Sequence, residues 1–113
     1  MSRLYIAVLD EFPDYMTPTL VAHSMLGAHL KFCNNSLYLD WLNNSFKKCV
    51  VRVNQKEFDK ICILPDTYIG WENKTLDGRP ACAVVVPSYE EIPNVLKFAK
   101  LWKPKDVNDS KSA

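Results

Sequence analysis

The stretch RLYIAVLD, residues 3–10, is a nearly continuous apolar run that stops at an aspartate. A short run of this kind is typical of a strand that is buried on both faces, as in a sheet covered by helices. Residues 81–86, ACAVVV, have the same character, and Pro87 ends them. Two such strands predict an α/β protein in which helices pack against the sheet.

A helix follows the first strand. In the pair Thr17-Pro18, threonine is a good N-cap and proline suits the first helical position. This pair predicts a helix over residues 18–32, which the polar cluster at residues 34–36 then ends.

The rest of the chain alternates between helix-like and strand-like segments. We expect a three-layer sandwich in which helices flank a mixed four-stranded β-sheet. A single domain should cover residues 1–103, and residues 104–113 should form a flexible polar tail. The full predicted order is strand 3–10, helix 18–32, helix 37–46, strand 47–53, helix 54–63, strand 67–71, strand 81–86 and helix 89–100.

The composition is that of a folded domain of nearly balanced charge. The chain has 113 residues, of which 48% are hydrophobic, and this is enough for a packed core. The formal net charge of +1 creates no overall field that would draw the protein onto nucleic acid or an anionic membrane. A local basic surface stays open as an alternative, for example around Lys47 and Lys48.

The cysteines and glycines argue against a metal or a bound cofactor. None of the four cysteines forms a C-x-x-C pair, and no histidine stands at a zinc-like spacing from them. The three glycines are not clustered, so they cannot build a loop that cradles phosphate. We expect reduced thiols, no cofactor, no leader segment and no membrane span, which together favour a cytoplasmic location.

The predicted helix over residues 18–32 carries both histidines of the chain, His23 and His29. On a helical wheel, His29 falls near the centre of the apolar arc and His23 falls at its edge, while Ser24 and Gly27 lie on the opposite arc. We therefore expect His29 to be a core or half-buried histidine, and His23 is the better candidate for a site.

In layout, nearly the whole folded part resembles the type 2 peptidyl-tRNA hydrolase family. Ala22-His23 and the following SMLGAHLKF are similar to the first helix of that family, where alanine or serine precedes a histidine. Trp41 and KKCVVRV resemble its tryptophan-bearing segment and lysine-led strand, and VNQKEF resembles its next helix start. In LDGRPACAVVVP, Gly78 and Pro87 stand in matching places.

Several polar residues of that family are replaced here. With His23 in the histidine place, Met16 stands where the family has a lysine and Leu20 where it has a glutamine. Sliding the helix by three instead puts Thr19 on the lysine and His23 on the glutamine. The segment YIGWEN lacks the family's aspartate, and Ala81 takes the place of its threonine. Neither register restores the polar set that would activate water and stabilise an oxyanion.

The resemblance implies two functions between which the sequence does not decide. One is hydrolysis of the ester of peptidyl- or acyl-tRNA by a rebuilt site, and the other is binding of a protein, RNA or small-molecule partner by a catalytically inactive relative. A tRNA or another RNA end is an expected partner, and open sheet edges would let a second copy pair into a homodimer. The candidate catalytic residues are His23, Asp14 and Asp77, and the candidate substrate-binding residues are Thr19, Lys47, Lys48, Glu72, Gly78 and Arg79.

Overall fold

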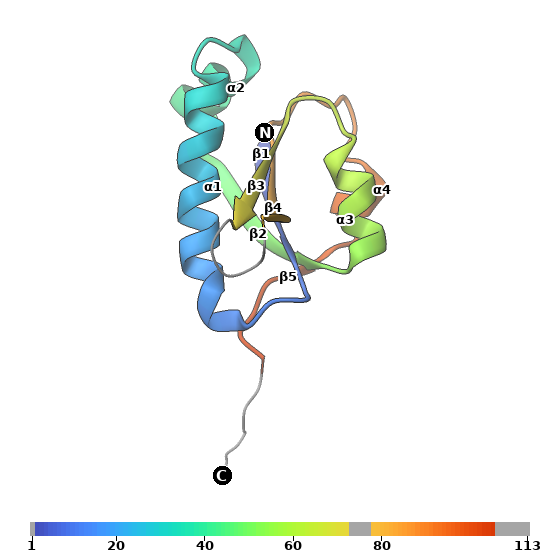
Figure 1. Cartoon of the computed structure of the whole chain (residues 1–113). Coiled ribbons are helices and arrows are strands. Elements are labelled where there is room, and N and C mark those ends of the chain that lie inside the picture. The colour runs from blue at the N-terminus through green and yellow to red at the C-terminus, as the bar shows by residue number, and fades with distance from the viewer. Residues whose placement is uncertain (1, 73–77, 106–113) are drawn as a thin grey trace.

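The computed structural model of the chain, shown in Figure 1, describes residues 2–72 and 78–105. Its strands and helices follow the predicted order, with one short strand added after the last helix. The elements are β1 (Arg3–Leu9), η1 (Asp14–Met16), α1 (Thr17–Phe32), α2 (Ser36–Asp40), η2 (Trp41–Ser45), β2 (Lys47–Val53), α3 (Gln55–Cys62), β3 (Thr67–Glu72), β4 (Arg79–Val85), α4 (Asn94–Lys97) and β5 (Lys100–Leu101).

The sheet has five strands in the order β3-β4-β1-β2-β5, so the prediction of four strands is wrong by one. β1 and β2 run parallel and the other neighbours run antiparallel, so the sheet is mixed, as predicted. The additional strand arises because the helix predicted over residues 89–100 shrinks to α4. Pro93 has an extended conformation and cannot donate a backbone hydrogen bond, so the helix begins only after it.

Helices lie on both sides of the sheet. Figure 1 shows α1 along one side and α3 together with α4 on the other. α1 packs mainly over β3 and β4, whereas α3 contacts β1, β3 and β4. In the part of the chain that the structure describes, no helix is both long and apolar enough to cross a membrane.

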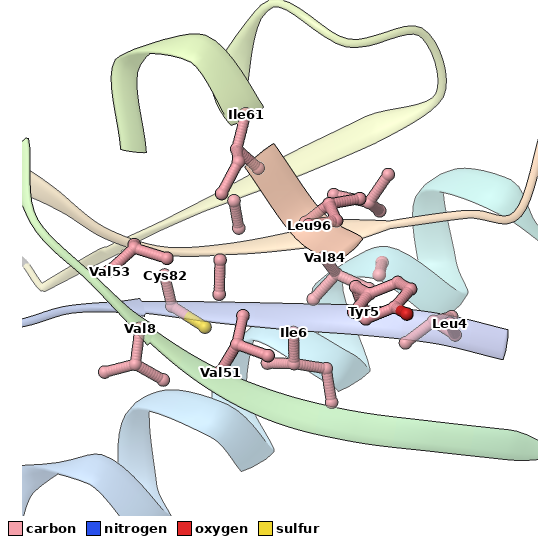
Figure 2. Packing of buried hydrophobic residues seen from close by; sticks show 14 of the residues in the cluster. Leu4, Tyr5, Ile6, Val8, Val51, Val53, Ile61, Cys82, Val84 and Leu96 are labelled. Atoms are coloured by element: carbon pink, nitrogen blue, oxygen red, sulfur yellow. The ribbon is translucent and has the colours of Figure 1, made fainter. Parts of the chain in front are cut away.

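The two central strands β1 and β4 carry the core. β1 is buried from its second residue to its last, and β4 is buried over its last five residues, as the apolar runs predict. Figure 2 shows Ile6 and Val8 pointing toward the side of α1, whereas Ile61 of α3 reaches toward the opposite face. Burial on both faces explains why these strands do not alternate between apolar and polar residues.

α1 turns a different face to the sheet than the helical wheel predicts. Ser24 is buried, whereas Leu26 and Leu30 are 63% and 68% exposed. The prediction that His29 is buried or half-buried is wrong, because this residue is exposed, although its ring centre lies 5.7 Å from that of the buried Tyr38. Its Nδ1 atom lies 3.0 Å from the hydroxyl oxygen of Tyr38, so the imidazole is held at the surface by a hydrogen bond.

The orientation of α1 follows from a close approach between small residues. A methyl group on Gly70 of β3 would lie 2.0 Å from Ser24 Oγ, and one on Gly27 would lie 2.3 Å from the hydroxyl oxygen of Tyr68. A Cβ atom at either distance would force its neighbour to shift, so the helix sits closer to β3 than two larger side chains would allow. Close packing of small residues between α1 and β3 accompanies the burial of Ser24, while Leu26 and Leu30 stay exposed.

The start of α3 follows its sequence signal. The Asn54 side chain accepts a hydrogen bond from the Glu57 N–H at 2.8 Å, and the Glu57 side chain accepts one from the Asn54 N–H at 2.9 Å. This reciprocal pair is a capping box. Thr17, predicted as the N-cap of α1, is instead its first residue, with Met16 in the cap position.

Candidate functional site

The ends of several strands meet at one edge of the sheet, which we call the carboxyl edge. The parallel strands β1 and β2 end there at Leu9 and Val53, and β4 begins there at Arg79. α1 starts at the same edge, because only residues 10–16 separate it from β1. In α/β proteins the carboxyl ends of parallel strands are the usual place for a ligand.

An ion-pair cluster formed by Arg52, Asp10 and Asp14, the Arg52 cluster, occupies part of the carboxyl edge. Arg52 Nη1 donates to Asp10 Oδ1 at 2.9 Å and to Asp14 Oδ1 at 3.0 Å, and Arg52 Nη2 donates to Asp14 Oδ2 at 3.1 Å. The two bonds to Asp14 form a bidentate pair, which is a strong geometry between a guanidinium and a carboxylate. The Arg52 and Asp14 side chains are only 17% and 21% exposed, so solvent screens this pair weakly.

The segment that follows β5 closes over the Arg52 cluster. Arg52 Nη2 also donates to the carbonyl oxygen of Lys103, and its guanidinium lies 4.9 Å from the centre of the Trp102 ring. The Lys105 N–H donates to Asp14 Oδ2 at 2.6 Å. Lys105 belongs to the tail predicted over residues 104–113, so this hydrogen bond ties the start of that tail to the Arg52 cluster. Residues 106–113 of that tail lie outside the described residues.

The surroundings of Asp14 hold the pKa of its carboxyl group below the ordinary value. The hydrogen bond from Arg52 is the largest cause, burial opposes it, and the N–H of Lys105 adds to the lowering. The same pair raises the pKa of Arg52. A general base works best when its pKa lies near the working pH, so an Asp14 carboxylate with a lowered pKa accepts a proton poorly.

A cavity of about 390 Å³ opens between α3 and the β3–β4 pair, and we call it the α3–β3 cavity. Phe58 and Cys62 of α3, Ile69 and Trp71 of β3, and Pro80 form its apolar wall. Burial raises the pKa of the Cys62 thiol to about 11, so this group stays neutral and packs as an apolar one. Trp71 is 47% exposed, which leaves part of an aromatic ring open to solvent beside the cavity.

Three polar side chains, Gln55, Asp59 and Arg79, complete the lining of the α3–β3 cavity. Gln55 Nε2 donates to Asp59 Oδ1 at 2.8 Å, and Arg79 Nη2 donates to Glu11 Oε1 at 2.6 Å. The Arg79 and Glu11 side chains are 50% and 44% exposed, so this ion pair is open to water and weak. An apolar wall with a few convergent polar groups is the usual make-up of a small-molecule site.

A second cavity, of about 360 Å³, lies beside the Arg52 cluster. Four of its polar groups are already engaged with one another: Asn54 and Glu57 form the capping box, and Arg52 binds Asp10. A ligand there would have to break helix caps or ion pairs that stabilise the fold. The α3–β3 cavity is therefore the better candidate for a binding site.

The structure brings some of the predicted site residues to the carboxyl edge. Asp14 lies in the Arg52 cluster, Arg79 lines the α3–β3 cavity, and Gly78 occupies the turn before β4 with a φ of 73° that favours glycine. Thr19 and His23 are exposed one helical turn apart on α1, and neither lines either cavity.

The remaining predicted residues are not gathered at this edge or lie outside the described residues. Lys47 and Lys48 begin β2, at the end of the sheet opposite the carboxyl edge. Lys48 Nζ donates to the carbonyl oxygen of Phe46 at 2.9 Å and lies 3.4 Å from the centre of its ring. Glu72 ends β3 at the carboxyl edge, and Asp77 falls outside the described residues.

Sequence reasoning did not single out Arg52 as an organising residue. One signal could have found it, because Arg52 is a charged residue between two valines in a strand that reads as buried. A buried charge needs a partner, and the nearest acids in the predicted topology follow the neighbouring parallel strand. Phe58 and Cys62 carry no such signal, because a cavity depends on how α3 lies over the sheet.

The described residues contain no group of three or more histidine, cysteine, aspartate or glutamate side chains that could hold a metal ion. The chain matches no protein-family model and no curated protein.

Proposed function

We propose that the protein is a catalytically inactive member of the type 2 peptidyl-tRNA hydrolase superfamily, with a three-layer α/β/α architecture, that binds a partner at its carboxyl edge. The observation that carries this proposal is the bidentate pair between Arg52 and Asp14. Asp14 is the one candidate catalytic carboxylate among the described residues, and this ion pair gives its side chain a structural role.

The chemistry of ester cleavage explains why the Arg52–Asp14 pair argues for binding. Hydrolysis needs a group that takes a proton from water and donors that stabilise an oxyanion. Asp14 has a lowered pKa, and the guanidinium beside it donates to two aspartates and a carbonyl oxygen. Most of the hydrogen-bonding capacity of both groups is already used within the cluster, since Asp14 accepts three bonds and Arg52 donates four.

One further observation concerns the place of action. Cys33, Cys49, Cys62 and Cys82 are all free thiols, which supports a cytoplasmic place of action.

A hydrolase with a rebuilt site is the second candidate, and the exposure of His23 favours it. His23 lies on α1 one turn after Thr19, and both are open to solvent, so a substrate could reach them together. In this alternative His23 would act as the general acid or base, and a tRNA end would be the substrate.

The two candidates differ in turnover of peptidyl-tRNA. We expect incubation with the protein to cleave the ester no faster than buffer alone, measured by release of free tRNA. If cleavage occurs, the inactive assignment is wrong, and two variants then locate the chemistry. Loss of a general base typically lowers the rate by about 100- to 10,000-fold. His23→Ala should show that loss in a hydrolase, whereas His29→Ala, which removes the other exposed histidine of α1, should not.

Binding of RNA can be separated from binding of other partners by its salt dependence. A surface that contacts several phosphates loses affinity steeply as salt rises, because counterions are released. Several cations at the carboxyl edge are already paired with carboxylates: Arg52 binds Asp10 and Asp14, Arg79 binds Glu11, and Lys105 lies 3.5 Å from Asp10. We therefore propose a protein or small-molecule partner ahead of tRNA. A homodimer through the open edge of β3 is a further proposal, which sedimentation at several concentrations would test.

A further inference from the structure

The α3–β3 cavity has a wall suited to an aromatic ring. Trp71 is 47% exposed beside it, so a flat apolar group could cover ring surface of this residue that water now contacts. Aromatic pairs add to the gain from burial when their rings stack offset or edge to face. The volume of about 390 Å³ is at the lower end of the range for small-molecule sites.

The polar lining of the cavity carries both signs of charge. Arg79 supplies a guanidinium with five N–H donors, of which Nη2 binds Glu11. Asp59 supplies a carboxylate, of which Oδ1 accepts from Gln55. Both side chains retain capacity for a further hydrogen bond, because a carboxylate has about four acceptor positions.

This arrangement of charges selects among ligands that share one ring. A ligand with only a carboxylate would face the negative Asp59, and a ligand with only an ammonium would face the positive Arg79. A ligand that carries both groups matches both rim charges, and each contact is a charge-assisted hydrogen bond. Repulsion between like charges disfavours the ligands that carry one charge, and attraction between opposite charges favours the ligand that carries both.

We propose that the α3–β3 cavity binds a free aromatic amino acid, with its ring against Trp71, its carboxylate at Arg79 and its ammonium at Asp59. The inference rests on the proposed function, because it names the ligand class for the carboxyl edge of a binding protein. Cys62 contributes only apolar wall, since its thiol remains neutral.

Four probes with the same indole ring test the assignment: L-tryptophan, 3-indolepropionate without the ammonium, tryptamine without the carboxylate, and 3-methylindole with neither. Titration calorimetry measures each affinity, and amide shifts in NMR spectra locate the site at residues 55–62 and 69–71. We expect L-tryptophan to bind at least tenfold more tightly than each single-charge probe, because one hydrogen bond to a charged group contributes about tenfold or more. Equal affinities for all four probes, or no binding of L-tryptophan at millimolar concentration, would overturn the proposal.

Variants of Arg79, Asp59 and Trp71, which line the cavity, then assign each contact. Arg79→Gln should remove the advantage of L-tryptophan over tryptamine, and Asp59→Asn should remove its advantage over 3-indolepropionate. Trp71→Ala should weaken all four probes by about fivefold or more, as expected for loss of a stacked ring. Lys100→Gln, in the neighbouring cavity, is the matched control and should change none of them. If the rim variants leave the selectivity intact, the assignment of the two charges is wrong.

The test of the ligand class can be distinguished from the test of the proposed function. Cleavage of peptidyl-tRNA would contradict the inactive assignment and leave the amino-acid site standing if the titrations succeed. Failure of the titrations without cleavage would contradict only the ligand class.

Discussion

Gly70→Ala should destabilise the protein by about 3 kcal/mol, at the upper end of the range for an overpacked core. The added methyl group would lie 2.0 Å from Ser24 Oγ and 3.0 Å from Ser24 Cβ, and Ser24 is buried at 1% exposure. Helix α1 and strand β3 would have to move apart to accommodate the methyl group. Urea unfolding monitored by circular dichroism measures the loss as a lower midpoint with an unchanged slope.

Two companion variants make the Gly70 result specific. Ser24→Ala combined with Gly70→Ala removes the closest atom and should recover at least half of the lost stability. Gly27→Ala meets only the far end of the Tyr68 side chain, which can shift, and it gains about 1 kcal/mol of helix propensity. It should therefore stay within about 1 kcal/mol of the native protein. Native-like stability of Gly70→Ala would show that α1 does not pack on β3 as described.

Arg52→Gln should cost about 2 to 3 kcal/mol of unfolding free energy at neutral pH. The substitution removes a bidentate pair to Asp14 and a hydrogen bond to Asp10, and hydrogen bonds to charged groups contribute about 1.5 to 3 kcal/mol. It also leaves the mostly buried Asp14 carboxylate without its cation. Chemical denaturation at pH 7 gives the difference directly.

Arg79→Gln is the matched control for the Arg52 substitution. Both variants exchange an arginine that pairs with a carboxylate at the carboxyl edge, but the Arg79–Glu11 pair is about half exposed. Exposed pairs contribute about 1 kcal/mol or less, so this variant should unfold close to the native midpoint. Equal losses for the two variants would contradict the organising role of the Arg52 cluster.

The central fold was predictable because its signals are local. The runs at residues 3–10 and 81–86 are apolar without alternation, and the structure buries both as central strands. Asn54 and Glu57 predict the start of α3 through a capping box that needs only four residues of chain. Such signals survive folding because tertiary contacts do not compete with them.

Where the sequence misled, a tertiary contact competed with a local pattern. The wheel placed Ser24 and Gly27 on the solvent side of α1, but small residues let the helix approach β3, and the apolar Leu26 and Leu30 are left exposed. At the end of the chain, Pro93 delays the last helix and frees residues 100–101 to add a fifth strand.

The candidate site was predictable only in part. The resemblance drew attention to Asp14 and Arg79, which do lie at the carboxyl edge, but not to Arg52, which sets their electrostatics. Ion pairs between residues 38 or 42 positions apart depend on strand register. That register is a property of the whole sheet, and no short motif encodes it.

The pH dependence of stability should follow the Asp14 carboxyl. Its pKa in the folded protein is lowered from the ordinary 3.8, so its contribution is fully present above that value. The contribution is lost as the pH falls through the lower pKa of the folded state. Arg52→Gln should reduce the acid-induced loss of stability, because it moves the pKa of Asp14 back toward the ordinary value.

Titration of the Asp14 side-chain carbon by ¹³C NMR, from neutral pH to pH 2, tests most directly whether this group belongs to the fold or to chemistry. The ion pair with Arg52 predicts a midpoint below 3.8 in the native protein and a higher one in Arg52→Gln. A native midpoint well above 3.8, toward neutral pH, would mark Asp14 as a group able to exchange protons with a substrate, and would contradict the assignment of an inactive binding protein.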